Sequence, residues 1–197
     1  MRILPYRGSH DQTAASYSDA YNAAIPLVRS VYQGPLVVDI PGWGQETNTA
    51  VAASALLSDS HLVFSAHIYP QAYNQVAGRP VSPADVQDLF IQSGRPCIIG
   101  EFGDIIEASG SPSPRTVNTN TSTSTPSSLL AEEEDKDQCD VRAVVQAARA
   151  VGFQGVYGWA WNGDGGSLNM VAPSWVFVPT SVTYVPTDYF WSILELL

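Results

Sequence analysis

Short apolar runs alternate with amphipathic stretches along most of this chain. Runs rich in β-branched and aromatic residues predict buried strands over residues 36–40, 61–69, 97–102 and 153–161. Apolar residues at helical spacing predict helices over residues 16–31, 48–57, 83–92, 140–151 and 187–197. Strands and helices therefore follow each other in turn.

Local signals mark several boundaries of these elements. Ser16 or Ser18 can cap the first helix, and Pro26 predicts a kink or an early stop within it. Ser82 followed by proline starts the helix at residue 83, and Gly94 ends it.

The alternation of strands and helices predicts right-handed parallel crossovers and an α/β fold. Four parallel strands fit either a small doubly wound sheet or half of a (β/α)8 barrel. A whole barrel needs about 250 residues, so a chain of 197 residues is too short for a complete one.

Composition narrows the class of ligand. The chain is 45% hydrophobic and carries 9 basic against 19 acidic side chains, which argues against nucleic acid and anionic membranes as partners. Abundant aromatic residues suit a neutral, ring-shaped ligand. No run approaches the ~20 apolar residues of a membrane span, and residues 1–7 lack the apolar core of a signal peptide, so a secreted protein would lack its beginning here.

One domain is expected over residues 1–197, interrupted by an insertion at about 109–137. Residues 109–128 are rich in Ser, Thr, Pro and Asn and too poor in apolar side chains to pack, and a charge run follows them. The tract contains the sequon Asn120-Thr121-Ser122. The two cysteines form no metal cluster, and Cys97 is expected to be a buried thiol.

A carboxyl group stands where the third predicted strand ends, at Glu101. Such a group is costly unless it is hydrogen-bonded, paired or used, so Glu101 is a candidate site residue. A plainer interpretation is an acid that caps the next helix or meets an arginine.

The other strand ends carry candidate chemistry too. Trp43 follows the first strand, His67 and Tyr69 end the second, and Trp159 and Trp161 end the fourth. Each could be ordinary packing, but barrel enzymes build sites from the carboxyl ends of several strands, which favours one shared pocket. Tryptophan faces there offer a stacking platform for a sugar ring.

Taken in order, four segments resemble the second half of the catalytic domain of glycoside hydrolase family 5. That family comprises retaining endoglucanases, mannanases and their relatives on a (β/α)8 barrel. The resemblance runs from Arg7 to about Val171 and rests on Gly42-Trp43-Gly44-Gln45, Phe64-Ser65-Ala66-His67-Ile68-Tyr69, Ile98-Ile99-Gly100-Glu101-Phe102-Gly103 and Gly158-Trp159-Ala160-Trp161-Asn162-Gly163.

The resemblance implies an incomplete barrel, about strands five to eight with their helices, and assigns roles to its residues. Glu101 matches the nucleophile, with His67 and Tyr69 flanking it. Trp159 matches the aromatic floor under the sugar that is cleaved, and Trp43 a wall of a neighbouring subsite, while Trp161 is a further binding candidate. Retaining hydrolysis needs two carboxyl groups about 5 to 5.5 Å apart.

The sequence departs from the family at the second carboxyl. The family carries an Asn-Glu pair where this chain has Ile3 and Leu4, so the acid/base glutamate is missing. His10, Asp11 and Glu46 lie nearby in sequence, but none of them occupies a matching strand end.

Several hypotheses follow. In the first, the chain derives from a secreted, retaining β-glycan hydrolase for glucan or mannan. In the second, this particular chain is a truncated gene model or fragment that cannot hydrolyse its substrate. In the third, it is a catalytically dead carbohydrate-binding fragment. A phosphate-binding protein is disfavoured, because no glycine-rich turn opens a helix after a strand. No cofactor or metal is implied, and open strand edges predict self-association.

Overall fold

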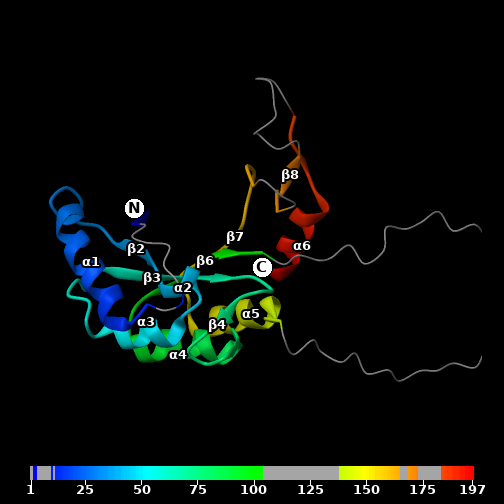
Figure 1. Cartoon of the computed structure of the whole chain (residues 1–197). Helices are drawn as coiled ribbons and strands as arrows, with labels where there is room; N and C mark the ends of the chain where they lie inside the picture. The colour runs from blue at the N-terminus through cyan, green and yellow to red at the C-terminus, as the bar shows by residue number, and fades with distance from the viewer. Residues whose placement is uncertain (1, 4–9, 11, 104–137, 165–167, 173–182) are drawn as a thin grey trace, which may run out of the picture.

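The computed structural model describes residues 2–3, 10, 12–103, 138–164, 168–172 and 183–197 (Figure 1). The insertion expected at about 109–137 lies outside these residues, as do Leu4 and Asp11.

A parallel sheet forms the centre of the molecule. Its five strands run in the order β1-β2-β3-β6-β7, and every neighbouring pair is parallel. They are β1 (Arg2–Ile3), β2 (Leu36–Asp39), β3 (Leu62–Ile68), β6 (Cys97–Phe102) and β7 (Val156–Gly158). The predicted α/β fold and incomplete barrel are confirmed.

One edge of the sheet differs from the sequence prediction. The strand at residues 36–40 was expected to have an open edge, but β1 pairs with it through Arg2 opposite Val37 and Ile3 opposite Val38. Two residues carry too little periodicity to be recognised as a strand from sequence. In the described sheet, β1 and β7 are therefore the edge strands.

Helices cover one side of this sheet, where α3, α4 and α5 lie side by side (Figure 1). Each presents its apolar stripe to the strands. The helices are α1 (Ala14–Arg29), α3 (Thr47–Ser54), α4 (Pro83–Ser93), α5 (Val141–Val151) and α6 (Asp188–Leu196). All match predicted helices within a few residues.

The start of α1 differs from the prediction. Thr13, rather than Ser16 or Ser18, is the N-cap, and its hydroxyl accepts a hydrogen bond from the Ser16 amide in a capping box. The helix continues through Pro26 to Arg29, so the early stop predicted there is wrong.

The start and end of α4 agree with the prediction. Ser82 caps it, Pro83 opens it, and Gly94 ends it with a φ of 62°. Asp85 lies in the first turn, and its carboxylate accepts a hydrogen bond from the backbone amide of Ser82, the N-cap residue.

Several short elements near the strand ends were not predicted from the sequence. The segments Tyr73–Asn74 (β4) and Arg79–Pro80 (β5) form one antiparallel hairpin, and Val171–Ala172 (β8) pairs with Val185–Pro186 (β9). A tight turn, α2 (Pro41–Gly44), follows β2. The last sheet strand ends at Gly158, so Trp159 and Trp161 lie in the connection beyond it.

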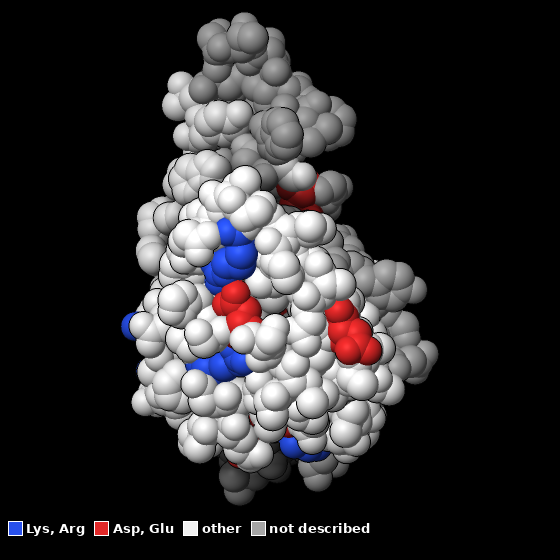
Figure 2. Space-filling model, turned by 90° about the vertical axis from the view of Figure 1, so that its left-hand side faces the viewer, with Lys and Arg blue, Asp and Glu red and all other residues white. Residues whose placement is uncertain are grey.

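Arginines tie together the segments that lead into the strands. Arg29 forms a two-pronged ion pair with Asp59, at 2.7 and 2.9 Å. Arg95 donates to the carbonyls of Ser54, Leu57 and Asp59. Figure 2, which views the molecule from the α1 side, shows the few charged groups of this face set among uncharged surface, with both signs present. These contacts stabilise the end of the sheet opposite to Glu101.

Apolar side chains of the strands fill the core. Leu36, Phe64 and Ile99 are fully buried. Cys97 is buried among them as a free thiol, as predicted, and burial raises its pKa to about 12. Among the described residues, no helix is long and apolar enough to cross a membrane.

A register shift between β3 and β6 matters for the site. Ala66 pairs with Ile99, but His67 pairs with Glu101, so Gly100 is an extra residue on β6. A bulge of this kind re-aims the side chains that follow it.

Candidate active site

Glu101 lies near the carboxyl end of β6, and two predicted neighbours surround it. The hydroxyl of Tyr69 donates to its Oε2 atom at 3.2 Å, and Nδ1 of His67 lies 3.6 Å from the same oxygen. The Glu101 side chain is 15% exposed, so it is shielded but reachable. The structure thus brings together three residues from two adjacent strands.

Asp39 joins this group, although the sequence reasoning did not single it out. Its Oδ1 atom lies 3.1 Å from Nε2 of His67, so the histidine stands between two carboxylates. Asp39 ends β2, in an otherwise apolar run. A single aspartate in such a run is the signal that could have identified it.

Glycines make room for His67 and Tyr69. A Cβ atom on Gly44 would lie 2.6 Å from Cγ of His67, and one on Gly103 would lie 3.1 Å from Cε1 of Tyr69. The backbone of Gly44 also has a φ of 84°, a value that residues with a side chain rarely adopt. The glycines of the sequence motifs therefore allow the backbone to approach the site closely.

Tyr69 stays protonated in this environment. Burial raises its pKa well above the usual range, and the neighbouring Glu101 carboxylate raises it further. Since a neutral phenol can donate a hydrogen bond, Tyr69 keeps its role as donor to Oε2 of Glu101.

The tryptophans differ in their surroundings. Trp159 is 38% exposed, its indole nitrogen lies 3.5 Å from Oδ1 of Asp164, and its carbonyl accepts a hydrogen bond from Tyr189. Trp161 is 61% exposed and packs edge-on against Phe190 of α6.

Trp43 is half exposed and adopts a positive φ of 62° next to Gly44, the glycine that contacts His67. Half-exposed indoles are suited to stacking on sugar rings.

Glu46 is a structural group rather than a second site acid. It is fully buried, and its carboxylate accepts from the Gln75 amide at 2.7 Å and contacts Nδ1 of His10 at 2.8 Å. Neighbouring Gln45 likewise binds the hairpin, by accepting from the Tyr73 amide at 3.0 Å.

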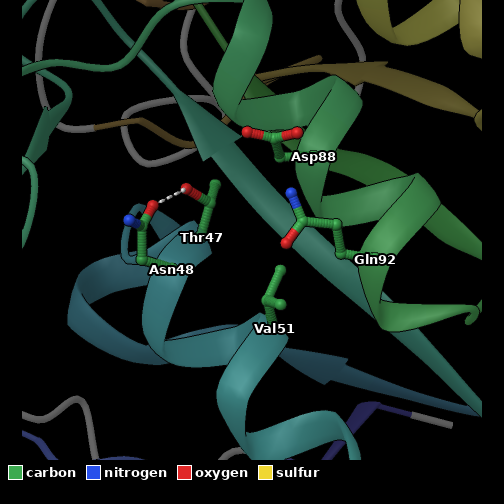
Figure 3. A pocket seen from close by; sticks show the side chains of 5 residues that line it. All are labelled: Thr47, Asn48, Val51, Asp88 and Gln92. Atoms are coloured by element: carbon green, nitrogen blue, oxygen red, sulfur yellow. Dashed lines mark hydrogen bonds between the residues drawn. The ribbon is translucent and has the colours of Figure 1, made fainter.

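A pocket of about 140 Å³ lies elsewhere, between α3 and α4 (Figure 3). The residues that line it are Thr47, Asn48, Val51, Asp88 and Gln92. The Thr47 hydroxyl donates a hydrogen bond to the side-chain oxygen of Asn48. The pocket includes none of the residues around Glu101. No group of three or more His, Cys, Asp or Glu in the described part of the chain could hold a metal ion.

The arrangement around Glu101 is that of an aimed carboxylate. The Tyr69 hydroxyl donates a hydrogen bond to one of its oxygens and His67 lies beside the same oxygen, while exposed aromatic rings lie on the connections that follow β2 and β7. Such a group can attack an electrophilic carbon or take a proton.

Comparisons with known proteins identify relatives of this chain. A scan against protein-family models finds no match. The chain is 31% identical over 175 residues to a mannan endo-1,4-beta-mannosidase of Streptomyces lividans, in an alignment that covers 86% of the chain and 37% of that protein.

Solved structures show the same fold. The catalytic domain of a mannanase from Streptomyces sp. SirexAA-E matches with a TM-score of 0.53 at 22% identity, over 86% of this chain and 46% of that one. The beta-mannanase of Thermomonospora fusca matches with a TM-score of 0.50 at 25% identity, over 83% of this chain and 48% of that one.

The chain thus spans about half the length of these structures and just over a third of the curated relative. Its ordered motifs, its parallel sheet and these relatives together support the resemblance of the chain to part of the catalytic domain of glycoside hydrolase family 5.

Proposed function

We propose that the chain carries the nucleophile side of a retaining β-1,4-mannan hydrolase, with Glu101 as the nucleophile. The observation that carries the proposal is the hydrogen bond that the Tyr69 hydroxyl donates to Oε2 of Glu101 at 3.2 Å, with Nδ1 of His67 at 3.6 Å from the same oxygen. In this proposal the Glu101 carboxylate attacks the anomeric carbon and forms a glycosyl-enzyme.

Trp159 is proposed to stack under the sugar that is cleaved, with Trp43 and Trp161 at neighbouring positions. All three rings are more than one third exposed. Mannan is favoured over glucan because the curated relative is named as a mannan endo-1,4-beta-mannosidase and the matching solved structures are named as mannanases. An extracellular place of action for this polymeric substrate is part of the same proposal.

Ile3 and Leu4 occupy the positions of the family's Asn-Glu pair, and an aliphatic side chain cannot protonate a leaving group. We therefore expect this chain alone to release no sustained reducing ends from mannan. Sustained release that is lost in Glu101→Gln would refute this part of the proposal.

A substrate that needs no protonation tests the nucleophile separately. In 2,4-dinitrophenyl β-mannobioside, the dinitrophenolate leaves without protonation by an acid. Attack by Glu101 should therefore release about one equivalent of dinitrophenolate and leave the mannobiosyl group bound covalently to Glu101. The burst is read by absorbance, and peptide mass spectrometry locates the sugar on Glu101.

Two variants frame this experiment. Glu101→Gln should abolish the burst, whereas Glu195→Gln, which changes an exposed carboxyl on α6, should retain it. An equal burst from Glu101→Gln would contradict the assignment. Binding of mannohexaose by calorimetry without any burst would favour the alternative, a carbohydrate-binding fragment without catalysis.

A further inference from the structure

Three ionisable side chains lie in a row across three adjacent strands. Asp39 comes from β2, His67 from β3 and Glu101 from β6. Nε2 of His67 is 3.1 Å from Asp39, and Nδ1 is 3.6 Å from Glu101. Their side chains are 18%, 11% and 15% exposed, respectively, so water competes little for these contacts.

The contact with Asp39 determines where the histidine carries a proton. A carboxylate only accepts hydrogen bonds, so the nitrogen that faces it at 3.1 Å must donate. Nε2 therefore holds a proton, and the ring turns Nδ1 toward Glu101.

Both Asp39 and the ring are held in place. The backbone carbonyl of Asp39 accepts from the Tyr17 hydroxyl at 2.8 Å. Gly44 abuts the His67 ring, and a Cβ on Gly100 would lie 3.7 Å from its Nε2 atom. The carboxylate thus meets the imidazole from a fixed strand end.

We propose that Asp39 is a positioning residue, which fixes the orientation of the His67 ring through a hydrogen bond from Nε2–H, so that Nδ1 faces Oε2 of Glu101. Its importance for hydrolysis rests on the proposed function of Glu101. The hydrogen bond itself does not, so it can be tested without turnover.

The test is nuclear magnetic resonance of imidazole N–H protons in the ¹⁵N-labelled 197-residue chain. The His67 signal is assigned by its loss in His67→Gln. In the wild-type chain we expect a proton on Nε2, shifted downfield by the charged acceptor. Asp39→Ala should lose this signal to exchange with water, while Asp19→Ala, which removes an exposed acid from α1, should keep it.

Asp39→Asn is the second variant, because it preserves shape if Asp39→Ala fails to fold. Its amide oxygen still accepts, but without charge, so the Nε2 proton should remain and move upfield. A wild-type proton found on Nδ1 alone, or a signal unchanged in Asp39→Asn, would overturn the proposal. Failure of the mannobioside burst would count against the proposed function and leave this result standing.

Discussion

At the scale of single residues, the site depends on backbone positions without side chains. Gly44 and Gly94 both have a positive φ, of 84° and 62°. A Cβ on Gly44 would lie 2.6 Å from His67, whereas one on Gly94 would meet nothing within 4 Å. A comparison of alanine substitutions at Gly44 and Gly94 therefore distinguishes the cost of steric contact from the cost of backbone strain.

We predict that Gly44→Ala costs more stability than Gly94→Ala. Both pay about 1 kcal/mol for the left-handed conformation, and only Gly44→Ala adds about 1–3 kcal/mol for overpacking. Urea unfolding of both variants measures the difference. Equal losses would show that His67 moves aside without cost.

The sequence could group the residues around Glu101 but not all of them. Glu101, His67 and Tyr69 stand at ends of strands that were clear from their apolar runs, and such ends meet at one edge of a sheet. Asp39 was not recognised as a site residue from the sequence, because it continues an apolar run. Its role emerges only when β2 and β3 are placed side by side.

At the scale of elements, the β4–β5 hairpin is tied to α4. Arg79 forms an ion pair with Asp85 at 2.6 Å, and Asn74 donates to Asp85 at 3.2 Å. Burial raises the pKa of Asp85, but hydrogen bonds from Arg79 and Ser82 outweigh it and hold the pKa below its ordinary value. The carboxylate therefore stabilises the fold when it is charged.

We predict that Asp85→Asn lowers the free energy of unfolding by about 1–3 kcal/mol at pH 7. Because the folded pKa is depressed, this contribution is present above the unfolded pKa of about 3.9 and is lost as the pH falls through the folded value. Denaturant curves for the variant and the wild type should keep their separation from pH 7 to about pH 5 and draw together as the pH falls below about 4.

Asp88→Asn is the control on the same helix, since Asp88 is exposed. It should change stability by less than about 0.5 kcal/mol. A constant gap between Asp85→Asn and wild type across this pH range would contradict the assigned role of charge.

The sequence predicted long elements better than short ones. The main helices and strands have enough residues to show a period, whereas β1, β4 and β5 have two residues each. Their pairing depends on neighbours that are distant in sequence. The early stop, one of the two alternatives at Pro26, did not occur because packing of α1 against the core outweighs one lost hydrogen bond.

At the scale of the whole molecule, the sheet exposes an edge. Strand β7 has one neighbour in the described sheet, and its Tyr157 side chain is 57% exposed. Nearby α6 exposes Trp191 and Leu194 as well. Unpaired strands and apolar patches favour association between chains.

We predict that the chain self-associates and that Tyr157→Lys weakens this association, because a lysine on an edge strand opposes pairing. Sedimentation velocity at increasing concentration measures the effect. Leu27→Lys is the control, since Leu27 is 75% exposed on α1, away from β7. A monomeric wild-type chain, or equal effects of both variants, would count against the edge as the contact.

The extra residue at Gly100 has one more consequence. In a regular strand, Ile99 and Glu101 would lie on the same face of the sheet, because they are two residues apart. The bulge absorbs Gly100, so Ile99 lies opposite Ala66 whereas Glu101 lies opposite the next residue, His67. One short strand can therefore place an apolar side chain in the core and, two residues later, a carboxylate on the opposite face beside His67.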